Sequence, residues 1–164
     1  MKRIGLISET HGFIHPRVSD FFRECDEIWH AGDIGNIATA DQLSKLKPFK
    51  AVYGNIDGSQ LRISFPEHEL FYCEEVKVLM IHIGGYPGRY NPKARKLIED
   101  NKPKLFISGH SHILKVMPDK KHKLLHINPG AAGNSGLHKS ITMVRFVIDK
   151  QEIKDLEVLD IKRK

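Results

Sequence analysis

The segment IGLISETH, residues 4–11, decides the interpretation of this chain. Its first four residues, Ile4 to Ile7, are apolar, and a run this short is typical of a buried strand. Glu9 and His11 follow, two residues apart. On an extended segment, residues at i and i+2 lie on the same face, so both side chains can reach one point. The segment therefore predicts a strand that delivers polar ligands at its carboxyl end.

Seven more short runs, rich in β-branched or aromatic residues, are also typical of strands. They are Glu27–His30, Phe49–Tyr53, Val76–Ile81, Leu105–Ile107, Leu124–Ile127, Ile141–Ile148 and Ile153–Leu159. The first, third and fifth of all eight runs are nearly all apolar, which predicts strands covered on both faces. The last two runs are expected to pair antiparallel through a turn at residues 149–151.

Helix signals fall between these runs. We expect helices beginning at Pro16, capped by Thr39 and ending before Pro48, and capped by Asn91 and ending before Pro103. The residues expected to face the core are Val18, Phe21, Phe22, Leu43, Leu46, Ala94, Leu97 and Ile98. Strand and helix alternate at first and strands dominate later, which predicts one layered α/β domain over residues 1–164.

Composition excludes several classes of protein. The formal net charge of +6 is spread along the chain, which favours anionic ligands but does not indicate nucleic acid. Two cysteines, Cys25 and Cys73, make neither a disulfide framework nor a metal motif, and we expect packed, reduced thiols. The first apolar run is too short for a signal peptide, and no stretch could span a membrane. These features predict a cytoplasmic protein.

Polar residues follow five of the predicted strands. The clusters are Glu9-Thr10-His11, Gly32-Asp33-Ile34-Gly35, Gly54-Asn55-Ile56-Asp57, His82 and Gly109-His110-Ser111-His112. In open α/β sheets, ligands bind beyond the carboxyl ends of the strands. Carboxylate, imidazole and amide donors suit divalent Mn, Fe, Ni, Co or Zn. The glycines remove side-chain bulk where the backbone must turn or approach an ion closely.

Each of these residues also has an ordinary structural interpretation. His82 alone is more often a core histidine than a ligand, Asp33 can form an Asx turn, and Asn55 can be a loop residue. The metal hypothesis depends on their combination and order. We interpret the remaining histidines as structural or surface residues: His15, His30, His68, His122, His126 and His138.

In this order, the clusters together with Asn128-Pro129-Gly130-Ala131 resemble the calcineurin-like metallophosphoesterases, in particular their small single-domain bacterial and archaeal phosphodiesterases. The resemblance covers nearly the whole chain and implies a two-sheet β sandwich flanked by helices. It implies phosphodiester hydrolysis at a dinuclear centre, with metal-bound hydroxide as nucleophile and manganese as the first candidate metal. The substrate would be a small phosphate ester.

The resemblance also implies a role for each matching residue. Glu9, His11, Asp33 and His112 would hold one ion, while Asp33, Asn55, His82 and His110 would hold the other. Asp33 would bridge the ions, and Asn55 would also contact the substrate phosphate. The Asn128–Ala131 segment would close the last loop on the metal side and orient its neighbours.

Three positions depart from the family pattern. Glu9 stands where the family has Asp, so its carboxylate must reach the ion differently or bind it weakly. Gly84 stands where a second His follows His82 in relatives, and Ile56 stands where some relatives place a His after the Asn. Both usual sources of a proton for the leaving group are therefore missing. Tyr86, Arg89 and Tyr90 are the nearest candidates for leaving-group assistance, and Arg89 could pair with phosphate oxygens; an ordinary glycine-rich surface loop is the alternative.

Two further functions compete with a phosphodiesterase. Some proteins of this family, such as the sorting-coat subunit of retromer, have lost ligands and act as scaffolds. Retention of the ligand positions here favours an enzyme. Hydrolysis of phosphomonoesters or nucleotides is the other alternative, although no dedicated nucleotide pocket is recognisable. Whether the chain forms a homo-oligomer stays open.

Overall fold

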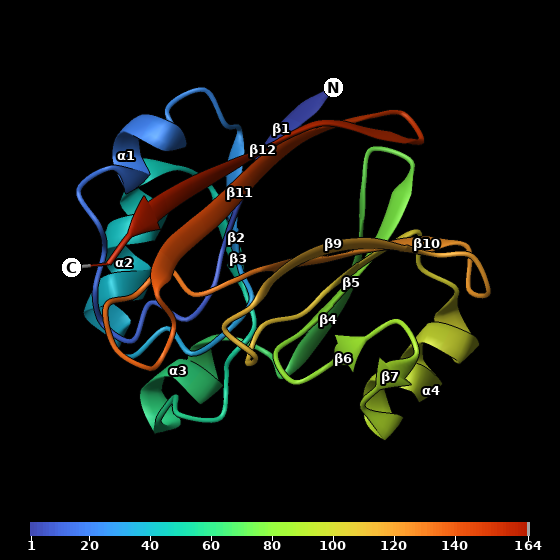
Figure 1. Cartoon of the computed structure of the whole chain (residues 1–164), viewed down its shortest axis with the longest axis horizontal. Coiled ribbons are helices and arrows are strands. Elements are labelled where there is room, and N and C mark those ends of the chain that lie inside the picture. The colour runs from blue at the N-terminus through green and yellow to red at the C-terminus, as the bar shows by residue number, and fades with distance from the viewer. Residues whose placement is uncertain (164) are drawn as a thin grey trace.

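Two five-stranded sheets lie face to face in the computed structural model, which describes residues 1–163 (Figure 1). The order of the first sheet is β12 (Glu152–Lys162), β11 (Ser140–Asp149), β1 (Lys2–Ile7), β2 (Glu27–His30) and β3 (Phe49–Ala51). The order of the second is β4 (His68–Cys73), β5 (Val76–Ile81), β8 (Leu105–Ile107), β10 (Leu124–Pro129) and β9 (Leu114–Asp119).

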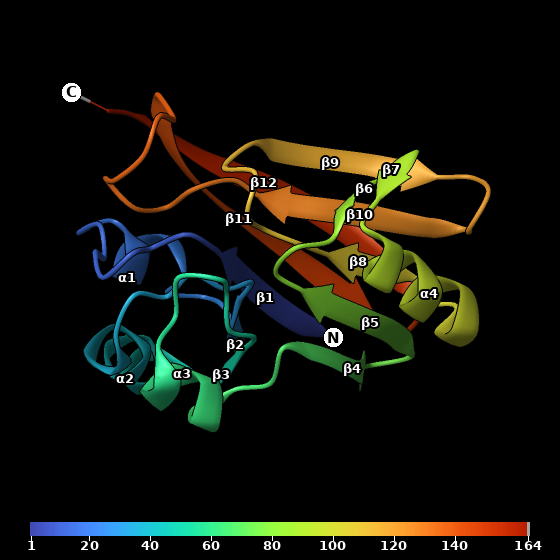
Figure 2. The ribbon, with the colours of Figure 1, turned by 90° about the horizontal axis from the view of Figure 1, so that it is seen from below.

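The central strands of each sheet run parallel, which determines where the site forms. β1 pairs with β2 and β2 with β3, so that Ile7 lies beside His30 and His30 beside Ala51. In the second sheet, β8 is parallel to both β5 and β10 (Figure 2). The carboxyl ends of β1, β2 and β3 therefore share one edge of their sheet, and those of β5 and β8 share one edge of theirs.

The main core lies between the sheets and contains alternate residues from both. Leu6, Trp29 and Phe146 of the first sheet pack in one cluster with Val78 and Ile107 of the second. All five side chains are buried. Strands present alternate residues to opposite faces, so the neighbouring residues pack against the helices.

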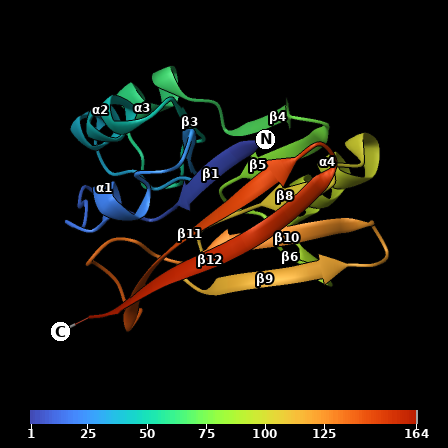
Figure 3. The ribbon, with the colours of Figure 1, turned by 90° about the horizontal axis from the view of Figure 1, so that it is seen from above.

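Helices cover the outer face of each sheet, as Figures 1 and 3 show. α1 (Val18–Phe21) and α2 (Ile37–Leu46) pack on the first sheet, where Phe22 and Leu43 join one cluster with Ile28. α4 (Pro92–Asn101) packs Ala94 and Ile98 onto the second sheet. α3 (Ser59–Ser64) lies beside β3, and a hairpin of β6 (Gly85–Tyr86) and β7 (Arg89–Tyr90) follows β5. The predicted two-sheet sandwich flanked by helices is confirmed.

The helix predictions need correction at two starts. α2 begins at Ile37, because the side chain of Asn36 accepts hydrogen bonds from the backbone N–H and hydroxyl of Thr39. Thr39 is therefore inside the helix and is not its cap. Pro16 lies in a turn two residues before α1. The third helix begins as predicted, since Asn91 accepts from the backbone N–H of Lys93 with Pro92 next to it.

The ends of these helices and their buried faces follow the prediction more closely. α2 ends before Pro48, and α4 ends before Pro103 at a left-handed Lys102. Leu43 is buried as predicted, whereas Leu46 is 40% exposed. α2 ends at Leu46, so this side chain has no following turn to pack beside it.

Several strands were not predicted, and each occupies a position where one face meets solvent. β4 and β9 are the edge strands of the second sheet, and β9 contains Pro118. Edge strands tolerate proline and polar residues because one side needs no ladder hydrogen bonds. β3 is also an edge strand and is shorter than predicted, with Phe49 and Lys50 only half-buried. The predicted coverage on both faces is confirmed for Ile4–Ile7 and Leu105–Ile107, but it is wrong for β3.

The predictions for the closing hairpin and for the two cysteines are confirmed. β11 and β12 form an antiparallel hairpin whose turn is at Lys150 and Gln151. Cys25 and Cys73 are buried free thiols, and burial raises the pKa of each to about 11. Within the described residues, no helix is long and apolar enough to cross a membrane.

Candidate metal centre

Seven predicted ligands converge where the two sheets meet at their carboxyl edges. Each lies within five residues of the end of a strand, and together they come from five strands of both sheets. They are Glu9 after β1, with His11; Asp33 after β2; Asn55 after β3; His82 after β5; and His110 and His112 after β8. Residues up to 103 positions apart in the sequence, such as Glu9 and His112, thus share one site.

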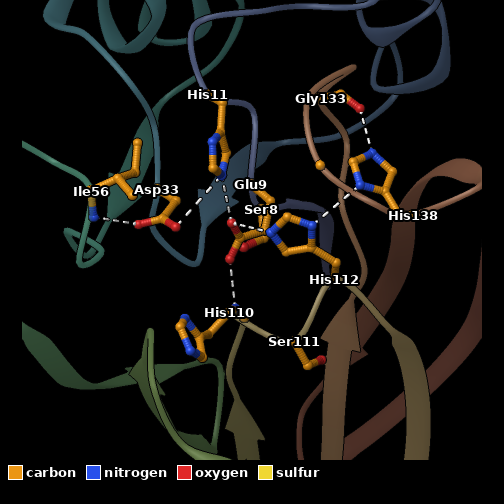
Figure 4. Close-up of polar contacts among 12 residues, drawn as sticks. Ser8, Glu9, His11, Asp33, Ile56, His110, Ser111, His112, Gly133 and His138 are labelled. Carbon is orange, nitrogen blue, oxygen red and sulfur yellow. Dashed lines mark hydrogen bonds and ion pairs between the residues drawn. The ribbon is translucent and has the colours of Figure 1, made fainter.

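The first group of candidate ligands consists of Glu9, His11 and His112, whose donor atoms lie within 4.8 Å of one another. Glu9 Oε2 is 2.8 Å from Nε2 of His11 and 3.0 Å from Nε2 of His112 (Figure 4). Two ligands placed about 2.1 Å from one ion, at right angles to each other, are separated by about 3.0 Å. The spacing of this group therefore suits one small divalent ion.

The second group consists of Asp33, His82 and His110, which satisfy the same limit of 4.8 Å. Asn55 belongs to it as well, because its Oδ1 is 3.0 Å from Nε2 of His82 and 3.1 Å from Nδ1 of His110. Asp33 connects the groups. Its Oδ1 is 3.3 Å from Nε2 of His82, and its Oδ2 is 3.5 Å from Nε2 of His11 in the first group. This position is the one that a bridging carboxylate requires.

The longer side chain of Glu9 places its carboxylate between the groups. Oε1 accepts a hydrogen bond from the backbone N–H of His110 at 2.6 Å and is 3.4 Å from Nε2 of His82. Oε2 faces His11 and His112, so the carboxylate is central in the cluster (Figure 4). The substitution of Glu for the usual Asp therefore does not remove this group from the site.

Five of the candidate ligands have a strained backbone. Positive φ angles occur at Glu9 (57°), His11 (48°), Asp33 (58°), His110 (70°) and His112 (64°). Non-glycine residues rarely adopt this left-handed conformation, and it concentrates at functional sites. The chain thus holds these side chains in directions that an unstrained backbone would not give.

Two glycines make the close approach of the loops feasible, as the sequence predicted. Gly32 has a φ of +102°, and a Cβ there would lie 2.5 Å from Nδ1 of His82. A Cβ on Gly54 would lie 2.0 Å from Oδ1 of Asp33. Any side chain at either position would displace a candidate ligand.

Hydrogen bonds to the protein fix the tautomer of two histidines. Nδ1 of His82 donates to the carbonyl of Ala31 at 2.8 Å, so its Nε2 lone pair faces Asp33 and Asn55 when the ring is neutral. Nε2 of His138 donates to the carbonyl of Gly133 at 2.7 Å, which leaves its Nδ1 as an acceptor. Nδ1 of His112 is 3.2 Å from that acceptor and donates to it, so Nε2 of His112 turns its lone pair to Glu9 (Figure 4).

With these tautomers, the facing donor atoms need a proton or a metal ion between them. Lone pairs of imidazole nitrogens and carboxylate oxygens face each other at about 3 Å, and such contacts are repulsive unless a proton or a metal ion lies between them. The residues therefore fit divalent metals, and the imidazole, carboxylate and amide donors match those that the sequence predicted. Within residues 1–163, no His, Cys, Asp or Glu other than the six predicted ones joins either group.

The pKa values of the acidic ligands reflect the same crowding. Burial is the largest influence on Glu9 and raises its pKa to about 8; the attraction of His82 opposes this shift, while the charge of Asp33 adds to it. Burial also acts to raise the pKa of Asp33, but the hydrogen bond and charge of His82 outweigh it, and the pKa falls. Without metal, one proton is therefore held at Glu9 near neutral pH, and a bound cation would displace it.

Several supporting residues were not predicted as parts of the site. His138, classed from the sequence as structural or surface, orients His112. Asp57 accepts from the backbone N–H groups of Ile34, Gly35 and Gly54, and so joins the Asp33 loop to the Asn55 loop. Only the position of Asp57 after a strand could have indicated this role; no local signal pointed to His138.

Two further buried residues form hydrogen bonds to the loops that carry the ligands. Nε2 of the fully buried His30 contacts the Thr10 hydroxyl at 2.9 Å, while its Nδ1 accepts from the N–H of Gly32. Burial lowers the pKa of His30 to about 3 and keeps it neutral, so its interpretation as structural holds. Asn128 donates to the carbonyl of Gly109 and to the hydroxyl of Ser111, which agrees with the orienting role expected for its segment.

The structure distinguishes among the three candidates for leaving-group assistance. The hydroxyl of Tyr90 donates to Asp119 at 2.6 Å, and burial with this contact raises its pKa strongly, so Tyr90 is not the missing acid. Tyr86 and Arg89 are exposed and line a pocket that His110 also lines. The backbone N–H of Ile56 donates to Oδ1 of Asp33, which gives this residue a positioning contact but no acid.

Gly84 cannot simply be replaced by the histidine that relatives carry. A Cβ at this position would lie 2.5 Å from Cζ of Phe106 and 2.9 Å from Cβ of Ser108. A histidine introduced at Gly84 would therefore have to displace Phe106, which occupies the space.

Fold and site together define a class: an α/β sandwich with two adjacent groups of candidate metal ligands at the carboxyl ends of its strands. Residues 1–151 match the calcineurin-like phosphoesterase superfamily domain, and the chain belongs to that superfamily. A probable metallophosphoesterase of Methanothermobacter thermautotrophicus is 33% identical over 135 residues, covering 78% of this chain and 76% of that protein. Another from Methanocaldococcus jannaschii is 32% identical over 157 residues, covering 92% and 79%.

Two solved structures share the fold. One is an archaeal phosphodiesterase, with a TM-score of 0.73 and 20% identity over 96% of this chain and 99% of that chain. The other is Vps29 of Entamoeba histolytica in complex with zinc, with a TM-score of 0.74 and 17% identity over 98% of both chains. At these identities the likeness concerns the fold alone.

Proposed function

We propose that this protein is a metal-dependent phosphodiesterase with a dinuclear centre. Glu9, His11, Asp33 and His112 would hold one ion, and Asp33, Asn55, His82 and His110 would hold the other. The observation that carries the proposal is Asp33, whose two carboxylate oxygens face the two groups separately. Manganese is the first candidate, and Fe, Ni, Co or Zn would suit the same donors.

Two divalent ions in such a site would hold a phosphate group and lower the pKa of a bound water. The chain itself would position the ions and the substrate, and its acidic ligands would balance part of the charge of the ions. Glu9 and Asp33 bring two negative charges against four positive ones, while the histidines and Asn55 are neutral ligands. The loaded site would remain electropositive by about two charges and attract a phosphate ester without a large basic patch.

The residues around the centre have distinct roles in this proposal. The amide of Asn55 lies between His82 and His110, where it can contact the substrate phosphate as well as an ion. The guanidinium of Arg89, beside His110 in one pocket, would pair with phosphate oxygens. The backbone N–H of Ile56 keeps Oδ1 of Asp33 directed at the second group.

A diester is favoured over a monoester by the surroundings of the centre. A pocket beside His110 and Ser111 can accept a second substituent on the phosphate, which a monoester lacks. The similar archaeal structure is that of a phosphodiesterase, which supports the same choice through the fold.

A non-catalytic scaffold on the same fold is the alternative. Vps29 shares the architecture, so the fold does not distinguish the two functions. All seven ligands converge, and five of them have a strained backbone, which favours the enzyme, since a scaffold has no use for this strain.

The test is metal analysis of the purified protein together with hydrolysis of bis-p-nitrophenyl phosphate in the presence of Mn²⁺. We expect two ions per chain, and Asp33→Asn should lose both together with activity. Asp119→Asn is the matched control, because Asp119 is a buried carboxylate bound to Tyr90 and His122 outside both groups. An Asp33→Asn protein that keeps two ions and full activity would refute the bridging role, and an unmodified protein that binds metal but hydrolyses no diester would favour the scaffold.

A further inference from the structure

A pocket of about 290 Å³ lies beside the second ligand group, on the outer face of the second sheet. The β6–β7 hairpin forms one wall through Tyr86 and Arg89, and Lys115 of β9 and His126 of β10 belong to the sheet beneath it. His110 and Ser111 also line it, so the pocket is continuous with the candidate metal centre. Its volume is at the small end for ligand pockets, which suits one small substituent.

The pocket is electropositive. Arg89 and Lys115 line it, and no Asp or Glu does. Among residues 1–163, neither cation forms an ion pair, while the ammonium of Lys115 lies 3.7 Å from the centroid of the Tyr86 ring. That contact holds Lys115 against the hairpin. Because no carboxylate neutralises Lys115 or Arg89, both positive charges are available to an anion in the pocket.

His126 gives the pocket a buried acceptor. The side chain is fully buried and stacks on Phe106, and its Nδ1 donates to the carbonyl of Phe106 at 3.1 Å. Burial lowers the pKa of His126 to about 4, so the ring is neutral and Nε2 carries a lone pair. This Nε2 is the one buried side-chain polar atom among the described residues without a hydrogen-bond partner.

An unpaired buried acceptor is costly and rare, so its presence in a pocket wall needs an explanation. Phenylalanine would keep the stacking on Phe106 without this cost. A ligand that donates an O–H or N–H to Nε2 would supply the missing partner. Arg89 and Lys115 line the same pocket and favour a ligand that also carries a negative charge.

We propose that this pocket binds one ester arm of the substrate, a small hydroxylated group that carries its own anion. The anion lies between Arg89 and Lys115, and a hydroxyl donates to Nε2 of His126. This inference rests on the proposed phosphodiesterase, because it assigns the group attached to the phosphate that the metal centre would hold. A glycerophosphate-like arm fits both the size and the chemistry.

The test uses glycerol 3-phosphate and n-propyl phosphate, which share a three-carbon chain and a phosphate but differ in two hydroxyls. Binding to the full-length protein is measured by NMR titration with a chelator present, so that neither probe can bind through metal. We expect glycerol 3-phosphate to bind about three- to tenfold more tightly, the effect of one net hydrogen bond.

Two variants separate the contacts. His126→Phe keeps an aromatic ring on Phe106 but removes the acceptor, and it should reduce the affinity for glycerol 3-phosphate to that for n-propyl phosphate. Lys115→Gln should weaken both probes about equally, by roughly tenfold. Thermal unfolding of each variant identifies any general loss of folding, and Lys115→Gln, at a half-buried position on an edge strand, tests the pocket even if His126→Phe is unstable.

Equal affinity for the two probes in the unmodified protein would overturn the role of His126. Absence of any binding without metal would overturn the subsite and leave the phosphodiesterase proposal intact. Conversely, a protein that binds glycerol 3-phosphate as expected but hydrolyses no diester with Mn²⁺ would refute the proposed function and not the pocket.

Discussion

Replacement of His138 by alanine should weaken the first metal site alone. His138 contacts no other candidate ligand than His112, and it fixes the tautomer of that residue through an Nδ1–Nδ1 contact of 3.2 Å. Without this acceptor, the His112 ring can rotate or move its proton to Nε2, the atom that faces Glu9. The variant therefore removes the orientation of a ligand and leaves the ligand itself in place.

The size of the effect follows from this geometry. A neutral hydrogen bond contributes about 0.5–1.5 kcal/mol net, a factor of about 2–13 in an equilibrium constant. Loss of a partner that orients a metal-binding histidine costs about 10–100-fold in metal affinity. The contact is long and His138 is only half-buried, which places it at the weak end of both ranges. We expect the dissociation constant of the first ion to rise by about tenfold.

Isothermal titration of the metal-free protein with Mn²⁺ resolves the two sites. In His138→Ala, one binding step should weaken, while the step that depends on His82 and His110 keeps its affinity. His138→Asn retains a side-chain oxygen as acceptor and should recover part of the loss. His68→Ala is the matched control, because His68 is also half-buried but lies on β4, outside both ligand groups.

Two results would refute this reasoning. Unchanged affinities in His138→Ala would mean that His112 needs no orientation. Equal weakening of both ions would mean that the loop at residues 133–138 supports the whole centre and not one ligand.

Three more predictions concern the packing at Gly84, the missing acid and the pKa of Glu9. Gly84→Ala should lower the free energy of unfolding by about 1–3 kcal/mol through overpacking against Phe106. Gly58→Ala is the control and should have little effect, because no atom lies within 4 Å of the new Cβ. Equal urea midpoints for the two variants would contradict this prediction. Rates for a series of aryl and alkyl diesters should depend steeply on the pKa of the leaving group, because Gly84 and Ile56 supply no acid, and a flat dependence would reveal an acid elsewhere. The pKa of Glu9 in the folded, metal-free protein is raised from 4.5 to about 8, so its contribution to stability is complete below pH 4.5 and is lost as the pH rises through about 8. Metal binding should therefore release this proton at pH 6.5 but not at pH 9. Calorimetry in buffers of different ionisation enthalpy measures the proton release, and no release at pH 6.5 would contradict the prediction.

The sequence by itself determined the strands that carry the site and the residues at their ends. Ile4–Ile7 and Leu105–Ile107 could be recognised because a strand buried on both faces must be apolar throughout. The ligands could be recognised because Glu9, Asp33 and His110 each follow a predicted strand within a few residues, which is a local pattern. Resemblance to a known family then supplied the pairing of these ligands into two groups.

Local signals were weaker where one face of an element meets solvent. β4 and β9 were missed because edge strands need neither a continuous apolar run nor every ladder hydrogen bond. The cap of α2 was misplaced by three residues because Asn36 and Thr39 both have side chains that cap helices, and only the contact between them decides.

Only the tertiary structure decided which distant residues support the ligands and which space is already filled. His138 reaches His112 across 26 residues, and Asp57 joins loops that follow different strands. The closed space beside Gly84 and the unpaired Nε2 of His126 likewise depend on how β8 and β10 place Phe106 and His126 side by side. Sequence periodicity reports which face of an element is buried, but contacts of this kind depend on the packing of one sheet, hairpin or loop against another, and no local pattern encodes it.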